Sequence, residues 1–168
     1  MQYSKDRLVG SVIASLYSLH YIATSPDWHF IDTVDLIFHE AGHAIFAFFG
    51  EFIHIAMGSG FQVLLPLSIA LYFFFSMREP FSGAICLMWV GQNLIDVSIY
   101  AGDSIAMQLP LLGGDSVMHD WNYLLTTLHI LSWTPEVAAT LYTMGILTIF
   151  LGIALSFLFT RTNTGRLA

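Results

Sequence analysis

Basic residues and cysteines are scarce in this chain. Its 168 residues contain five Lys and Arg against twelve Asp and Glu, which gives a formal net charge of −7. Nucleic-acid binding and a polybasic lipid-binding patch are excluded, because both need clustered positive charge and the chain has no run of basic residues. The single cysteine, Cys86, excludes an internal disulfide and a cysteine-rich zinc site.

Charge of either sign is rare as well. Charged residues make up 10% of the chain, 56% of the residues are hydrophobic, and the mean hydropathy is +0.70. Soluble domains are about one quarter charged, so this composition predicts an integral membrane protein in contact with membrane lipids. We expect one membrane domain over residues 1–168, an all-α polytopic transmembrane bundle of about five to six helices, because each crossing takes roughly 20 residues.

Apolar stretches and their breaks divide the chain into six candidate helices. The first stretch, Leu8–Thr24, has the outline of a signal peptide or of a first membrane span. We favour the span, because Pro26 directly follows the cleavage-like Ala23-Thr24-Ser25. The predicted helices cover residues 7–24, 33–50, 61–76, 81–101, 115–133 and 136–160.

Local signals add three expectations about the ends of these helices. Asp32-Thr33 predicts an N-cap, with Asp35 in the first turn, where acidic groups suit the helix dipole. Ile53–Met57 alternates apolar with small or polar residues, which favours a short strand or loop. The segment 102–133 begins as a Gly- and Pro-containing loop, and its pattern leaves open whether it crosses the membrane or re-enters it.

The few basic residues predict the orientation. With six spans, both ends of the chain face the cytoplasm, together with Lys5, Arg7, Arg161 and Arg166. Arg78 alone is then outside, which satisfies the tendency of positive charge to stay inside. We expect a prokaryotic inner membrane.

The most informative pattern is His39-Glu40-Ala41-Gly42-His43, a His-Glu-x-x-His motif in apolar surroundings. On a helix the two imidazoles leave the same face and can bind one Zn²⁺, while Glu40 can act as general base. A hydrolytic zinc site has three protein ligands and one position for water, which the metal makes acidic. His39 and His43 supply two ligands, so a third must come from elsewhere.

The helix predicted over 81–101 carries a polar stripe. Gln92, Asp96, Tyr100 and Asp103 follow the helical spacing, and a carboxylate at membrane depth needs a cation. The candidates for the third ligand are the ionisable residues of this and the next segment, and Asp96 leads by position. They are Asp96, Asp103, Asp115, His119 and Asp120.

A His-Glu-x-x-His motif in a membrane helix, followed two spans later by Asn93-x-x-Asp96, resembles the core of the site-2 protease family of intramembrane zinc metalloproteases. The resemblance covers about residues 33–103. It implies that Asp96 is the third ligand, although Val97 stands where the family has Gly, so His119 stays as the alternative. It also implies a small sheet after the motif helix, near Ile53–Met57, that holds an extended substrate segment.

The predicted activity is therefore hydrolysis of peptide bonds in or near transmembrane segments of a protein substrate. Two other functions fit the same residues. The chain could be a non-catalytic accessory subunit that retains a metal site and packs against partner membrane subunits. It could also conduct ions or protons along Asp96, Asp103 and the histidines, because paired carboxylates and histidines inside a bundle also mark transport paths.

Overall fold

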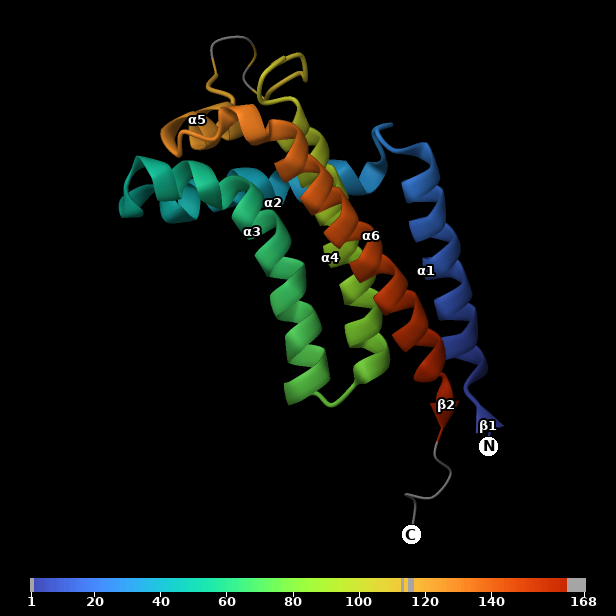
Figure 1. The fold of residues 1–168 in the computed structure, drawn as a ribbon. Coiled ribbons are helices and arrows are strands. Elements are labelled where there is room, and N and C mark those ends of the chain that lie inside the picture. The colour runs from blue at the N-terminus through green and yellow to red at the C-terminus, as the bar shows by residue number, and fades with distance from the viewer. Residues whose placement is uncertain (1, 113, 115–116, 163–168) are drawn as a thin grey trace.

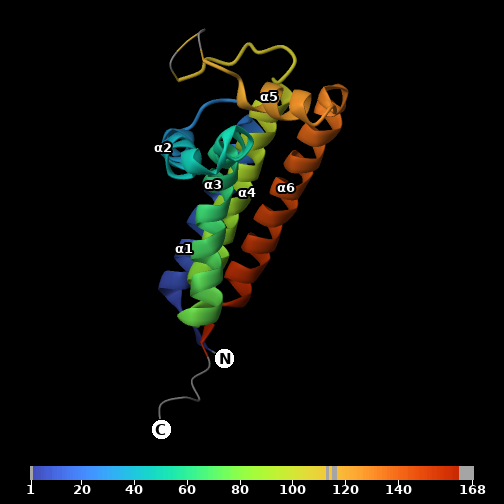
Figure 2. The ribbon, with the colours of Figure 1, turned by 90° about the vertical axis from the view of Figure 1, so that its left-hand side faces the viewer.

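Four long helices lie side by side, and two further helices cover one end of them (Figure 1). The computed structural model describes residues 2–112, 114 and 117–162. The predicted all-helical architecture is confirmed, with six α-helices in the described residues. The long helices are α1 (Lys5–Thr24), α3 (Glu51–Leu71), α4 (Pro80–Gly102) and α6 (Thr134–Leu158). The covering helices are α2 (Phe30–Phe46) and α5 (Asp120–Thr127), which lie at the upper end in Figures 1 and 2.

Short elements connect these helices. Ala47–Phe49 and Leu131–Trp133 are 3-10 turns, and Tyr72–Ser76 extends α3 as a π-helical segment. Strands β1 (Gln2–Tyr3) and β2 (Arg161–Thr162) pair antiparallel, with Gln2 opposite Thr162. The first and last elements therefore lie at the same end of the bundle (Figure 1).

Three helical segments are long and apolar enough to cross a membrane by length and composition. They are Glu51–Ser76, Pro80–Gly102 and Leu131–Leu158. The paired strands put both ends of the described chain at the same end of the bundle. Helix α1 runs alongside α4 and α6 (Figure 1).

The basic residues gather at the lower end of the bundle. Arg7 forms an ion pair of 2.5 Å with Glu79, at the turn between α3 and α4, and also donates to the carbonyl of Phe159 at 3.3 Å. Arg78 therefore lies at the same end as Arg7, so the prediction that places it on the opposite side is wrong. In this bundle of four long helices, the described Lys and Arg residues all lie at one end.

Close packing of α4 on α6 forms the centre of the bundle. A Cβ atom added at Gly91 would lie 2.6 Å from the carbonyl oxygen of Gly145, and one added at Gly145 would lie 2.7 Å from that of Gly91. Only glycine at both positions permits this approach, a common device in membrane helices. Tyr21, Ile95 and Ile149 form the buried apolar cluster beside this contact.

Two local predictions fail because tertiary contacts decide the conformation. Helix α2 begins at Phe30, and Asp32 is its third residue rather than the cap, with its Oδ2 accepting from the backbone N–H of His29 at 2.6 Å. The segment Ile53–Met57 is helical and belongs to the first turns of α3. The small residues that follow this segment do not terminate a strand. They allow α3 to pack closely against α2.

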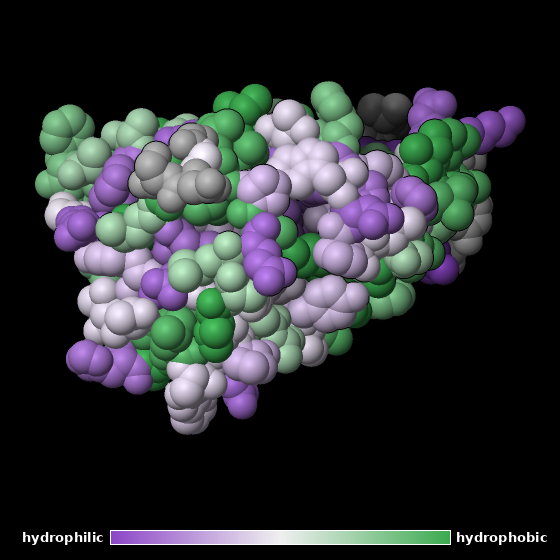
Figure 3. Space-filling model, turned by 90° about the horizontal axis from the view of Figure 1, so that it is seen from above, coloured by the Kyte–Doolittle hydropathy of each residue, from purple (hydrophilic) through white to green (hydrophobic). Residues whose placement is uncertain are grey.

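The region predicted as one helix over 115–133 contains, in its described residues, the short helix α5 and the 3-10 turn Leu131–Trp133. Helix α5 has eight residues and is about 12 Å long, too short to cross a bilayer. The segment between α4 and α5 covers the upper end of the bundle, where hydrophilic and hydrophobic residues are mixed on the surface (Figure 3). Large apolar side chains such as Leu147, Phe150 and Leu151 are more than half exposed along α6, as expected for a face in contact with lipid.

Candidate metal centre

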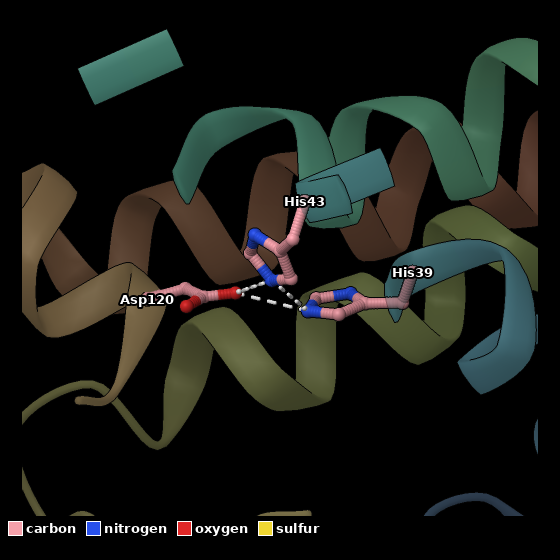
Figure 4. Close-up of side chains that lie close together, drawn as sticks. All are labelled: His39, His43 and Asp120. Atoms are coloured by element: carbon pink, nitrogen blue, oxygen red, sulfur yellow. Dashed lines mark hydrogen bonds and ion pairs between the residues drawn. The ribbon is translucent and has the colours of Figure 1, made fainter. Parts of the chain in front are cut away.

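The two histidines of the motif point to the same place from α2 (Figure 4). Because they are four residues apart, both side chains leave one face of the helix, and their Nε2 atoms lie 3.1 Å apart. The His39 side chain is buried and that of His43 is half-buried. The pair predicted from the motif is therefore placed to share one ion.

The third member of the group is Asp120, in the first turn of α5. Its Oδ2 lies 2.9 Å from Nε2 of His39 and 3.1 Å from Nε2 of His43 (Figure 4). Two contacts fix the start of α5, which carries this carboxylate. The backbone N–H of Asp120 donates to the hydroxyl of Tyr100 at 3.0 Å, and the ring of His119 accepts from the backbone N–H of Asn122 at 3.3 Å as the N-cap of α5. Within the described residues, His39, His43 and Asp120 form a group that could hold a metal ion.

The other ring nitrogens are also engaged. Nδ1 of His43 lies 2.9 Å from the carbonyl oxygen of His54, and Nδ1 of His39 lies 3.2 Å from Oε1 of Gln62. A carbonyl oxygen only accepts, so each Nδ1 carries a hydrogen and each neutral ring turns the lone pair of its Nε2 toward Asp120. Partners of this kind orient histidine ligands in metal sites.

The convergence of these groups requires a positive charge. Two imidazole lone pairs and a carboxylate within 3.1 Å of one another repel unless a proton or a metal ion lies among them. The hydrogen bond to Asp120 raises the pKa of His43, against the effect of burial. Burial alone would raise the pKa of Asp120, but the contacts of its carboxylate with both histidines hold that pKa below its ordinary value. A proton shared within the group or a bound metal ion would supply this positive charge.

The spacing of the three atoms suits a tetrahedral ion. Ligands about 2.0 Å from a tetrahedral centre are separated by roughly 3.3 Å, close to the 2.9–3.1 Å found here. Gly58 of α3 keeps the space beside them open. A Cβ atom at this position would lie 2.5 Å from Nε2 of His43 and 2.7 Å from Nε2 of His39. The residues present therefore fit a metal ion.

A cavity of about 230 Å³ opens beside the group and is lined by all three of its members. Glu40, the remaining residue of the motif, also lines this cavity. Its side chain is exposed and has no hydrogen bond or ion pair among the described residues. The arrangement leaves an open side for water and substrate, with a free carboxylate at the wall.

Asp96, the leading candidate for the third ligand, is separated from the group by one intervening side chain, that of Gln62. Its Oδ2 accepts a hydrogen bond of 2.6 Å from Nε2 of Gln62, whose Oε1 contacts the ring of His39. Asp96 therefore supports a histidine through an amide and also lines the cavity. Among the described residues Asp96 is not part of the convergent group, in which Asp120 is the carboxylate.

His119 points elsewhere although it is adjacent to Asp120. Its Nε2 lies 3.4 Å from Oδ2 of Asp103, and its Nδ1 caps α5. Asp103 in turn accepts from the backbone N–H groups of Gln108 and Leu109 at 2.9 Å, so both candidates shape the covering segment. Asp115, also a candidate, lies outside the described residues.

Two residues of the site carry only weak signals in the sequence. Asp120 is one of five candidates and not the leading one, because no spacing rule connects an eight-residue helix to a motif about eighty positions earlier. Gln62 interrupts an otherwise apolar helix, and an amide in such a position needs a partner, which is the signal that identifies it.

No protein-family model, curated protein or solved structure matches this chain in the three comparisons.

Proposed function

We propose that the protein is a membrane-embedded zinc metallopeptidase that hydrolyses peptide bonds in or near membrane segments, with a site of the kind found in site-2 proteases. The observation that carries this proposal is the convergence of His39, His43 and Asp120 at the wall of a cavity that Glu40 also lines. Three ligands with one open side characterise catalytic rather than structural zinc sites.

The donor set favours zinc. Two neutral imidazoles and one carboxylate form a ligand set found in zinc hydrolases, whereas calcium and magnesium prefer oxygen ligands only. When bound there, zinc would polarise the scissile carbonyl and increase the acidity of a water molecule. Glu40 would accept the proton of that water and transfer it to the departing amine. The hydrogen bonds to His54 and Gln62 would hold the rings in the required orientation.

The site differs from the resemblance in two respects. Its third ligand would come from α5, between α4 and α6, and the segment expected to hold a substrate strand is part of α3. A peptide segment would instead enter the cavity beneath the segment between α4 and α5, which contributes Leu109–Leu112 and Met118 to the lining. Apolar lining of this kind suits a hydrophobic stretch of substrate.

The position of the site supports a membrane location. It lies at the end of the bundle opposite to the described Lys and Arg residues, so the tendency of positive charge to stay in the cytoplasm puts the cavity at the outer face. A prokaryotic inner membrane remains a prediction from the sequence. At this end of the bundle, the site would be accessible both to water and to the end of a substrate helix.

The test is metal analysis combined with a cleavage assay on the full chain purified in a neutral detergent. We expect about one zinc per chain, lost in His39→Ala, and cleavage of a fluorogenic apolar peptide that stops in Glu40→Gln while zinc is retained. Glu51→Gln, a matched loss of charge at the exposed start of α3, is the control and should cleave like the parent.

Each failed outcome points to a different function. Protein that contains no metal in its native membrane, and does not take it up, would contradict the metal site. Metal-loaded protein that never cleaves and co-purifies in fixed ratio with other membrane proteins would contradict the hydrolase and favour the accessory subunit.

A further inference from the structure

The cavity beside the candidate metal centre has a one-sided charge. Besides Asp120, four carboxylate residues line it, and no Lys or Arg of the described ranges does so. They are Asp27, Asp32, Glu40 and Asp96. A divalent ion and Asp120 together carry a net charge of +1, and the other carboxylates outnumber it even when Asp96 is protonated. The cavity therefore disfavours a substrate segment that carries a negative charge.

Two of these carboxylates are held in place and lack a Lys or Arg partner among the described residues. Asp32 accepts from the hydroxyl of Tyr21 at 2.9 Å and from Nε2 of Gln92 at 2.8 Å, and its Oδ2 lies 3.5 Å from Nδ1 of His29. Asp96 accepts from Nε2 of Gln62 and has no ion pair among the described residues. Amides and a phenol orient both groups with their oxygens beside the cavity, so a positive charge that enters it would gain from both.

Aromatic rings accompany these carboxylates. Tyr21, Trp28 and Tyr100 line the same cavity. Carboxylates combined with aromatic faces form the usual recognition site for an ammonium group, because the ring quadrupole and the anion both attract it. The rest of the lining is aliphatic, including Leu36, Val97 and Ile99, and would contact the carbon chain that carries the charge.

We propose that the cavity selects peptide segments with an ammonium group, from a lysine side chain or a free N-terminus, which Asp96 and Asp32 bind beside the metal centre. This rests on the proposed function for its peptide substrate. It adds the substrate class, namely an apolar segment interrupted by one positive charge.

The test measures binding rather than cleavage, in the Glu40→Gln background, so that the peptide is not consumed. The probes are leucine-rich decapeptides with a dye at the C-terminus, read by fluorescence anisotropy in a maltoside detergent. Three have an acetylated N-terminus and carry Lys, norleucine or Glu at the centre, and a fourth carries norleucine and a free N-terminus. We expect the Lys peptide to bind about tenfold more tightly than the norleucine peptide, the range of a charge-assisted hydrogen bond, and the Glu peptide to bind most weakly.

The variant Asp96→Asn keeps the shape of the side chain and should bring the Lys and norleucine affinities close together. Asp6→Asn removes the same charge from an exposed position in the first turn of α1 and should leave their ratio unchanged. If the free N-terminus is preferred over the acetylated one, the ammonium group comes from the substrate terminus, which also supports the proposal.

Equal binding of all four peptides by the Glu40→Gln chain overturns the proposal, even if Asp96→Asn does not fold. A ratio that falls as much in Asp6→Asn as in Asp96→Asn also overturns it, because the preference would then reflect net charge. Selective binding without any cleavage by the parent chain would contradict the proposed hydrolase function and support the ammonium-binding site. Cleavage by the parent chain without selective binding would support the hydrolase and overturn the ammonium-binding site.

Discussion

Replacing Gly58 with alanine gives the sharpest test of the metal centre, because it adds one methyl group and changes no ligand. The added Cβ would lie 2.5 Å from Nε2 of His43 and 2.7 Å from Nε2 of His39, whereas ordinary contacts begin at 3.4 Å. The overlaps are 3.4 − 2.5, about 0.9 Å, and 3.4 − 2.7, about 0.7 Å. Metal–ligand distances tolerate about 0.2 Å.

The helices cannot separate easily to absorb this overlap. Helix α3 lies so close to α2 that a Cβ at Gly42 would be only 2.0 Å from the carbonyl oxygen of Met57. At least one imidazole must therefore rotate out of place. Since changing outer-shell partners alone costs 10- to 100-fold in metal affinity, we expect the loss of a direct ligand in Gly58→Ala to cost more than about 100-fold.

The assay is competition for zinc against a chelator, with circular dichroism and thermal unfolding as controls of the fold. Gly60→Ala is the matched variant on the same helix, because its Cβ would meet only the flexible side chain of Met57, with Sδ at 3.1 Å. It should bind zinc like the parent and gain up to about 1 kcal/mol from helix propensity. If Gly58→Ala folds and binds zinc as tightly as Gly60→Ala, the proposed position of the metal is wrong.

Three further predictions concern support, protonation and orientation. Gln62→Leu removes the partner of a ligand ring and should weaken zinc binding roughly 10- to 100-fold in the same competition assay, and an unchanged affinity would show that the contact is incidental. The pKa of His43 is raised, so zinc must displace a proton, and its affinity measured against pH should rise until that pKa is passed and fall as pH drops through it. With Cys86 replaced by Ser, a cysteine at Trp28 should react with an impermeant thiol reagent from outside intact cells and one at Arg78 should not, and the reverse result would invert the orientation.

The sequence predicts much of this molecule because hydrophobic length and the spacing of the motif are local properties. The helices over 7–24, 81–101 and 136–160 differ from α1, α4 and α6 by at most two residues at either end. The polar stripe of α4 also faces polar partners, with Gln92 bonded to Asp32, Asp96 to Gln62, and Tyr100 to the backbone of Asp120.

The failures concern residues whose conformation depends on distant contacts. Ile53–Met57 has a strand-like alternation, yet His54 donates from Nδ1 to the carbonyl oxygen of His43 at 2.8 Å and accepts from Nδ1 of His43 in return. This reciprocal pair fixes the segment as a helix against α2. The prediction of the third member of the site fails for a similar reason. Asp120 reaches the histidines only because Tyr100 and Ser104, at the end of α4, hold α5 across the bundle through Asp120 and Asn122.

Asp120 belongs to a part of the chain that does not cross the bundle, and this bears on how the site could work. Hydrolysis within a membrane needs water at a place that lipid excludes. Here α2 lies across the end of the long helices, and α5 closes on it from a covering segment (Figures 1 and 2). The histidines are fixed by α3, His39 through Gln62 and His43 through His54, whereas Asp120 is fixed through Tyr100 at the end of α4. A displacement of α5 would therefore remove one ligand and open the cavity in the same movement, while both histidines stayed in place. On this geometry, metal affinity and substrate access should depend on the same segment, and variants that loosen α5, such as Asn122→Ala, should weaken zinc binding without touching a ligand.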